Sequence, residues 1–271
     1  SVSAKFFNSK VTFEIPLSFT EVQVKGSFGS AAQLNAFISM LVTGVENSMT
    51  VKLDALIMRT INNMVGETLF AGLQVSGTIN PQKDSVSAVN LLKQYNAATG
   101  QALTAAKAIS DPAFIRYATY VIGMYQDRMS KVSTLFNTGG KERFSPKAMP
   151  HVVLLSDFSK ASEAFLMSAT FNEDRVALPS HESVPFWQGS GLTYGFADTS
   201  AISVKTSSGK VVALTGIIGV IFDRDALGVS NLSRRVTTNY NAKAEFYTNF
   251  YKFDAGYYND LNENIVVFFV A

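Results

Sequence analysis

The chain has 271 residues, of which 47% are hydrophobic, and this is enough apolar material for one or two domains with a substantial core. Its formal net charge of +2 argues against a strong electrostatic grip on nucleic acid. The absence of cysteine excludes disulfides, thiolate nucleophiles and cysteine-ligated metals. We find no apolar run of about eighteen residues and no leader pattern, so we expect neither a membrane span nor secretion.

The first predicted element is a strand at residues 11–19. Val11, Phe13 and Ile15 alternate with polar residues, which is the period-two pattern of a strand. Pro16 suits an edge strand or a bulge. A lone strand cannot satisfy its backbone, so we expect its partner to come from an upstream segment or from another subunit. An ordinary first strand in a processed protein is the alternative.

After Gly26 the apolar residues recur at helical spacing. Residues 27–30 offer capping hydroxyls, and the stripe that follows is predicted to be buried. Gly44 and the Thr50-Val51 pair can bend or break a helix, so the sequence allows one long helix or two in line. The stripe consists of Leu34, Phe37, Ile38, Leu41, Val42, Val45, Leu53, Leu56, Ile57, Ile61, Met64 and Val65.

The middle of the chain predicts short strands and helices in alternation. Residues 70–85 carry the glycines and proline of a hairpin linker, and residues 86–99 are predicted as one helix. Asp111 and Pro112 have the residue types of an N-cap and a first helical position. The apolar run at residues 151–155 precedes a helical pattern, and this strand followed by a helix indicates α/β packing.

Motifs that would carry catalysis or cofactor binding are weak. Gly139-Gly140-Lys141 lacks the first glycine and the final Ser or Thr of a phosphate-binding loop. His181 could serve a Ser-His-Asp system, which leaves a small soluble hydrolase as one alternative. His181 and Glu182 offer two metal ligands without a third at helical spacing. We therefore predict no catalytic, cofactor-binding or metal-binding residue.

The last third of the chain carries the most informative pattern. The apolar run at residues 217–222 stops at Asp223-Arg224-Asp225, as expected for a buried strand that meets a polar turn. An arginine between two carboxylates can form ion pairs across a subunit boundary or within its own chain. Residues 236–253 (VTTNYNAKAEFYTNFYKF) predict a long two-faced strand or a hairpin that ends before Asp254. A final strand is predicted at residues 264–270.

Arg234 and Arg235 precede the tyrosine-rich segment. In a nucleic-acid reader they would contact phosphate, with Tyr240, Tyr247 and Tyr251 as stacking platforms. Strand parity places these tyrosines on both faces of a sheet, and no basic field surrounds them. Symmetric subunit contacts are therefore the preferred interpretation of the two arginines.

This C-terminal region resembles tailed-phage major capsid proteins of the Hong Kong 97 fold, most closely those of small short-tailed phages related to Bacillus phage phi-29. The shared order is VIFDRDALG, then RRVT, then YTNFY, then IVVFFV. Together with the amino-terminal region, the resemblance covers most of the chain. It implies an α+β subunit with an extended arm strand at residues 1–26. It also implies a peripheral domain at residues 27–85 and 232–255, with a spine helix, and an axial domain at residues 86–231 and 256–271.

The resemblance also implies a structural role and no enzyme activity. Many copies would form hexamers and pentamers of an icosahedral shell around a phage genome, in a virion assembled in the host cytoplasm. The implied partners are copies of the chain itself, scaffolding and portal proteins, and DNA in at most weak non-specific contact, with no membrane and no cofactor. An encapsulin-like nanocompartment is the close alternative. The candidate subunit contacts are Val11, Phe13, Ile15, Asp223, Arg224, Asp225, Arg234 and Arg235.

Overall fold

A computed structural model describes residues 7–26, 29–167, 178–189 and 194–271. The chain forms two compact units: unit 1 contains Ser1–Thr60 and Gly228–Tyr258, and unit 2 contains Ile61–Leu227 and Asn259–Ala271. The first division between these compact units falls after Thr60, within α2, whereas the resemblance implies a peripheral domain that extends to residue 85. The reason is burial, because Met64, Val65, Leu69 and Leu73 are fully buried in unit 2.

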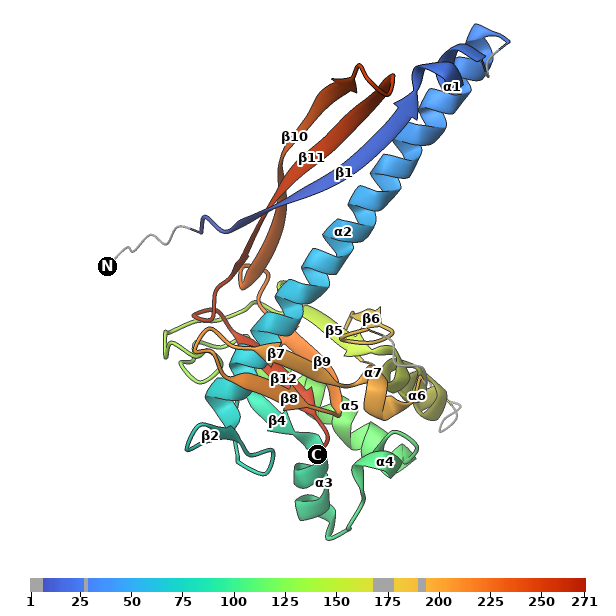
Figure 1. Cartoon of the computed structure of the whole chain (residues 1–271). Helices are drawn as coiled ribbons and strands as arrows, with labels where there is room; N and C mark the ends of the chain where they lie inside the picture. The colour runs from blue at the N-terminus through green and yellow to red at the C-terminus, as the bar shows by residue number, and fades with distance from the viewer. Residues whose placement is uncertain (1–6, 27–28, 168–177, 190–193) are drawn as a thin grey trace. The chain divides into compact units, whose positions relative to one another are not determined.

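Unit 1 contains a three-stranded sheet in the order β1-β11-β10. Its strands are β1 (Lys10–Thr20), β10 (Leu227–Asn241) and β11 (Phe246–Asn259), which lie side by side in Figure 1. β10 and β11 form a hairpin around a turn at residues 242–245, which confirms the hairpin interpretation. The predicted end before Asp254 is wrong, because β11 continues to Asn259.

β1 pairs with β11 of the same chain. The pairing is antiparallel and places Phe13 opposite Phe253 and Ile15 opposite Tyr251. The expectation of a partner from an upstream segment or another subunit is therefore wrong. The partner lies more than two hundred positions away in the sequence, where a search of neighbouring segments does not find it.

The outer edge of β1 is closed at its centre. Tyr257 N donates to Ser9 O at 3.1 Å, and because hydrogen-bonded pairs alternate along an antiparallel ladder, the even-numbered residues of β1 direct their backbone groups away from β11. Pro16 stands at one of these outward positions and has no N–H to offer. The outward carbonyl of Glu14 accepts from Lys52 Nζ at 3.1 Å. A further strand that approached this edge would therefore find no N–H at Pro16 and no free carbonyl at Glu14.

The helical pattern after residue 26 forms one continuous helix. α1 (Glu21–Gly26) is short, whereas α2 (Ala31–Leu73) runs for 43 residues, so Gly44 and Thr50 do not interrupt it. In unit 1, α2 packs Val45 and Met49 against Phe253, with Phe13 and Ile15 around them. This small cluster is the core of unit 1.

Part of the predicted stripe on α2 is not buried. Ile38, Val42 and Ile57 are 49%, 45% and 40% exposed, so the prediction of a buried stripe is wrong for these three residues. Ile38 and Val42 lie on the same helix face as the buried Val45 and Met49 but nearer the N-terminal end of α2, so the contact with the sheet covers this face only further along the helix. The single chain therefore leaves apolar helix surface uncovered.

Unit 2 is built on a five-stranded mixed sheet in the order β4-β12-β9-β5-β6. β12 pairs parallel with β4 and antiparallel with β9, and β5 pairs antiparallel with β9 and parallel with β6. The strands are β4 (Ala88–Asn90), β5 (His151–Leu155), β6 (Glu182–Val184), β9 (Ile217–Phe222) and β12 (Ile265–Phe269). The predicted strands at residues 151–155, 217–222 and 264–270 are thus confirmed.

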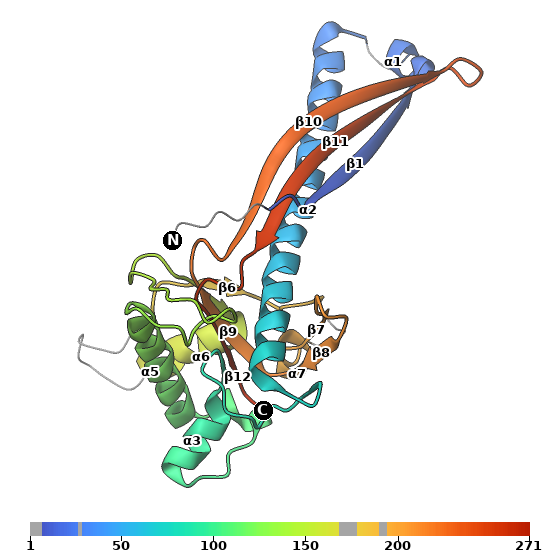
Figure 2. The ribbon, with the colours of Figure 1, turned by 90° about the vertical axis from the view of Figure 1, so that its left-hand side faces the viewer.

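Helices and two small hairpins complete unit 2. Figure 2 shows α5 and α3 on one side of β9 and β12, and residues of α3, α5 and α6 form one apolar cluster with those strands. The helices are α3 (Leu91–Thr99), α4 (Ala105–Ala108), α5 (Pro112–Met129), α6 (Ser156–Met167) and α7 (Phe196–Thr199). The hairpins are β2 (Gln74–Val75) with β3 (Thr78–Ile79), and β7 (Ile202–Lys205) with β8 (Val211–Leu214).

Local capping explains where two of these helices begin. Asp111 Oδ1 accepts from the N–H groups of Ala113 and Phe114 at 2.8 Å each, which confirms the predicted start of α5. The prediction of one helix over residues 86–99 is wrong at its start, because β4 pairs with β12 before α3 begins. Asn90 then caps α3 by accepting from Lys93 N at 3.1 Å. None of the helices described here is long and apolar enough to cross a membrane.

Candidate subunit contacts

Asp254 links the three strands of unit 1. This side chain of β11 accepts from Thr12 Oγ1 of β1 at 2.5 Å, from Ser233 Oγ of β10 at 3.0 Å and from Arg235 Nη1 of β10 at 2.7 Å. These donors, the Thr12 hydroxyl first, hold the pKa of Asp254 well below its usual range. Asp254 is only 7% exposed, so Arg235 is committed to an ion pair within the chain.

Arg234 also has an acceptor within unit 1. Its Nη1 lies 2.9 Å and 3.1 Å from the two carboxylate oxygens of Glu46 on α2. Both side chains are about half exposed, at 49% and 51%, so solvent screens this pair. The two neighbouring arginines thus bind carboxylates on different elements of the same unit.

The tyrosines near these arginines do not form an open stacking platform. The rings of Tyr240 and Tyr247 pack on each other with centroids 4.6 Å apart, and Tyr247 Oη donates to Glu21 Oε1 at 3.3 Å. Tyr251 packs against the core of unit 1. The geometry therefore gives no support to nucleic-acid stacking on these residues.

The three apolar candidates on β1 contribute to the chain's own fold. Phe13 stacks on Phe253 with ring centroids 4.9 Å apart, and Ile15 packs against the same cluster. Val11 lies opposite Ala255 and is partly buried. All three point to the face of the sheet that α2 covers, so their buried surface already has a partner in the chain.

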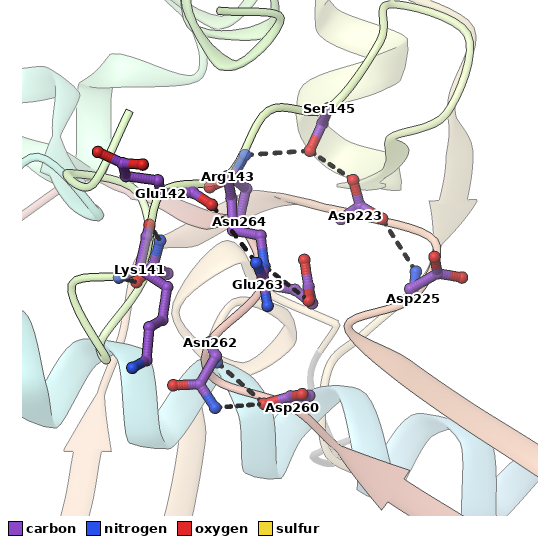
Figure 3. Close-up of polar contacts among 11 residues, drawn as sticks. Lys141, Glu142, Arg143, Ser145, Asp223, Asp225, Asp260, Asn262, Glu263 and Asn264 are labelled. Carbon is purple, nitrogen blue, oxygen red and sulfur yellow. Dashed lines mark hydrogen bonds and ion pairs between the residues drawn. The ribbon is translucent and has the colours of Figure 1, made fainter. Parts of the chain in front are cut away.

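Asp223 closes the polar turn after β9 in unit 2, as Figure 3 shows. It is 6% exposed, and its carboxylate accepts from Ser145 Oγ at 2.5 Å and from Asp225 N at 3.0 Å. Asn264 Nδ2 donates to Ser145 Oγ at 3.1 Å and extends this buried network. The carboxylate of Asp223 is thus enclosed within unit 2 and already has partners in its own chain.

Arg224 and Asp225 lie on the outside of the same turn. Their side chains are 61% and 72% exposed, and Arg224 Nε lies 3.8 Å from Asp225 Oδ1, which is a loose pair in solvent. Of the charged candidates, these two remain the most accessible to a second molecule.

The loop at residues 137–145 is held by polar contacts within unit 2. Asn137 Nδ2 donates to Lys141 O at 2.7 Å and Asn137 Oδ1 accepts from Lys141 N at 2.8 Å. Arg143 Nε lies 2.9 Å from Glu263 Oε1, as drawn in Figure 3. A Cβ added at Gly139 would collide with Asn262 Oδ1, so close packing accounts for a glycine there. The loop works as a structural link and not as a phosphate cradle.

His181 does not form a working hydrolase site. Its Nε2 lies 2.8 Å from Ser159 Oγ and its Nδ1 lies 2.8 Å from Pro179 O, so a carbonyl and not a carboxylate orients the ring. Ser159 is fully buried, which leaves its hydroxyl inaccessible to a substrate. Within the described parts of the chain, no group of three or more His, Cys, Asp or Glu side chains could hold a metal ion.

Solved phage structures share this fold, among them the following two. A chain in the capsid structure of Staphylococcus phage Andhra is 9% identical with a TM-score of 0.56, and the match covers 97% of this chain and 71% of that chain. A chain in the structure of the head fiber and inner core protein gp22 of native bacteriophage P68 is 9% identical with a TM-score of 0.58, covering 98% and 72%. The fold is therefore that of Hong Kong 97-type phage capsid subunits.

The family follows from the sequence itself. A family model described as Phi29-like phage major capsid protein matches residues 1–269. The chain belongs to this family, and it is a structural subunit of a phage capsid and not an enzyme. A search of the curated proteins finds no match. The α+β prediction and the resemblance to phi-29-like capsid proteins are both confirmed.

Sequence reasoning missed the residues that hold the charged candidates in place. No sequence motif indicated the two polar networks. One is Asp254 with Thr12 and Ser233, and the other is Asn264 with Ser145. The available signal was an aspartate within an otherwise aromatic strand, because a buried carboxylate needs several donors. The donors lie far away in the sequence, so the carboxylate alone indicates a network without naming its members.

Proposed function

We propose that copies of this chain assemble as hexamers and pentamers into a closed icosahedral shell that encloses a phage genome. The observation that carries the proposal is the family match over residues 1–269. The proposal also includes assembly in the host cytoplasm. The partners would be scaffolding and portal proteins, and contact with DNA would be weak. In this proposal unit 1 corresponds to the peripheral domain and unit 2 to the axial domain.

The surface of unit 1 supports association between copies. Its part of α2 exposes large apolar side chains, namely Ile38, Met40, Val42, Val51 and Ile57, each at least 40% exposed. Of these, Ile38 and Val42 are one helical turn apart on the same face, and adjoining exposed apolar side chains are typical of surfaces that another molecule covers. A shell provides such cover, because every subunit meets several neighbours.

Arg224 and Asp225 are the charged contacts that we retain for this proposal. Both are exposed in unit 2, and neither is committed to a buried partner. The other candidates already have contacts within the chain, so they would act at an interface only through the surface that these contacts leave exposed. They are Arg234, Arg235, Val11, Phe13 and Ile15.

Assembly and contents of the particles test the proposal directly. The full chain, expressed alone and with candidate scaffolding proteins of the same phage, should sediment as closed particles visible by electron microscopy. In virions, the particles should protect DNA from nuclease. Particles that contain protein cargo and no nucleic acid would favour an encapsulin-like compartment, and a monodisperse monomer under all conditions would contradict a shell role.

A further inference from the structure

The two edges of the unit 1 sheet differ in how open they are. β1 has Pro16 and the Lys52-capped carbonyl of Glu14 at the centre of its outer edge. β10 forms the opposite edge of the sheet in the described part of the chain, and it contains no proline. Every residue of β10 from Ser230 to Asn241 is exposed. An open edge of this length is a template for pairing with another strand.

The side chains on one face of β10 indicate which strand fits. Leu232, Val236 and Tyr240 share one parity and are 58%, 55% and 43% exposed. Arg234 and Thr238 stand between them on the same face. The three apolar residues are spaced by four, so the row is symmetric about Val236.

We propose that β10 pairs antiparallel with β10 of a second copy of this chain, about a two-fold axis at Val236. In this register Val236 lies opposite its own counterpart, and Leu232 lies opposite Tyr240 of the other copy. Each arginine falls opposite a threonine, Arg234 facing Thr238 and Arg235 facing Thr237. Apolar residues thus meet apolar residues, and no like charges are opposed.

Registers centred on the two arginines, or shifted from Val236 toward Tyr240, are less favourable. An axis at Arg234, at Arg235 or between them places like charges directly opposite each other, which destabilises a strand pair. Moving the axis toward Tyr240 shortens the paired segment and leaves Leu232 without a partner. The Val236 register pairs the strand from Asn231 to Asn241 without either defect.

The proposal rests on the proposed function only in taking a second copy as the occupant. One strand edge buries less surface than the roughly 1,200 to 2,000 Å² of stable complexes. The contact is therefore weak alone and gains strength where other subunit contacts hold the copies together.

Cysteine cross-linking of the full chain tests the register, because the natural chain has no cysteine to give background. Opposed Cβ atoms in an antiparallel pair lie about 4.5 to 5.5 Å apart, within reach of a short bis-maleimide. Val236→Cys should form covalent dimers with itself. Leu232→Cys and Tyr240→Cys should each give little dimer alone and should cross-link when the two variants are mixed.

Ser18→Cys on the β1 edge is the matched control and should give no dimer with itself or with Val236→Cys. Far-UV circular dichroism of each variant, compared with the unsubstituted chain, verifies that both units are folded, since Trp187 fluorescence reports on unit 2 alone. The proposal is overturned if folded Val236→Cys gives no dimer in particles or in concentrated solution, or if it cross-links to Ser18→Cys instead. Cross-linked dimers without particles would support the β10 pairing and contradict the shell. Particles without cross-linked dimers would support the shell and contradict the β10 pairing.

Discussion

Unit 2 and unit 1 are stabilised in different ways. In unit 2 every residue of β9 and β12 is buried, and helices α3, α5 and α6 add side chains such as Phe114 and Phe158 to one apolar cluster. In the described part of unit 1, Val45, Met49 and Phe253 form a small buried cluster, and the carboxylate of Asp254 joins the strands through polar contacts. Unit 2 thus depends on apolar burial, whereas unit 1 depends on strand pairing, a few apolar contacts and polar contacts between its strands.

The largest expected effect lies in the core of unit 2. Phe268→Ala removes a fully buried ring from β12 and should cost about 3 to 5 kcal/mol of unfolding free energy. Denaturant unfolding followed by Trp187 fluorescence measures it, because Trp187 is 2% exposed and lies in unit 2. Phe144→Ala, at a ring that is 57% exposed, is the control and should cost far less. Equal costs would refute the buried core.

A smaller effect is expected on α2 in unit 1. Leu56 is 5% exposed, and Leu56→Ala should cost about 2 to 3 kcal/mol, because the thin unit can relax around the missing side chain. Leu41 is only partly buried, and Leu41→Ala should cost about 1 kcal/mol. Calorimetry of the two variants gives the comparison. A larger loss at Leu41 would show that the helix faces the sheet with another side.

Acid should weaken unit 1 through Asp254. Its pKa is lowered in the folded chain, so its contribution to stability is complete above about pH 4 and is lost as the pH falls through the folded pKa. Asp254→Asn should lower the melting temperature at pH 7, and variant and natural chain should converge as the pH falls below about 4. Asp225→Asn, at a side chain that is 72% exposed, should change both quantities little. A constant difference between pH 7 and pH 3 would contradict the Asp254 assignment.

The smallest effect on subunit stability is expected at Arg224. Arg224→Glu should change the unfolding free energy by less than about 0.5 kcal/mol, because the side chain is 61% exposed. Particle yield should fall more, and the deficit should shrink in salt, which screens exposed charges over about 8 to 10 Å. Arg234→Glu is the comparison, since it also breaks the pair with Glu46. Normal assembly of an Arg224→Glu subunit with a lowered melting temperature would make this residue a support of the fold.

The local elements were the part of the fold that the sequence could predict. Alternation over residues 11–19, the Asp111-Pro112 helix start and the stop after Phe222 each depend on neighbouring residues. The pairing of β1 with β11 could not be predicted in this way, since it joins the two ends of the chain. Helical periodicity likewise marked Ile38 and Val42 as apolar without showing that both remain exposed among the described residues of the chain.

For the charged candidates, too, the sequence showed the local pattern but not the partners in the fold. The turn at Asp223-Arg224-Asp225 was visible as a pattern, but only Asp223 faces inward, because Ser145 lies beside it in the fold. Arg234 and Arg235 were recognised as a pair, and their partners Glu46 and Asp254 lie on elements distant in the sequence. Residue type identified charges, and the fold alone determined which charges remain accessible.

The closed edge of β1 sets a limit on how far the sheet can grow. If two copies pair through β10, the combined sheet has two outer strands, and both are β1. Each presents Pro16 and the Lys52-capped Glu14 carbonyl at its centre, so no third copy can extend the sheet. In that arrangement sheet growth would stop at two chains, and a protein made in many copies would avoid open-ended fibres while its other surfaces build a closed particle.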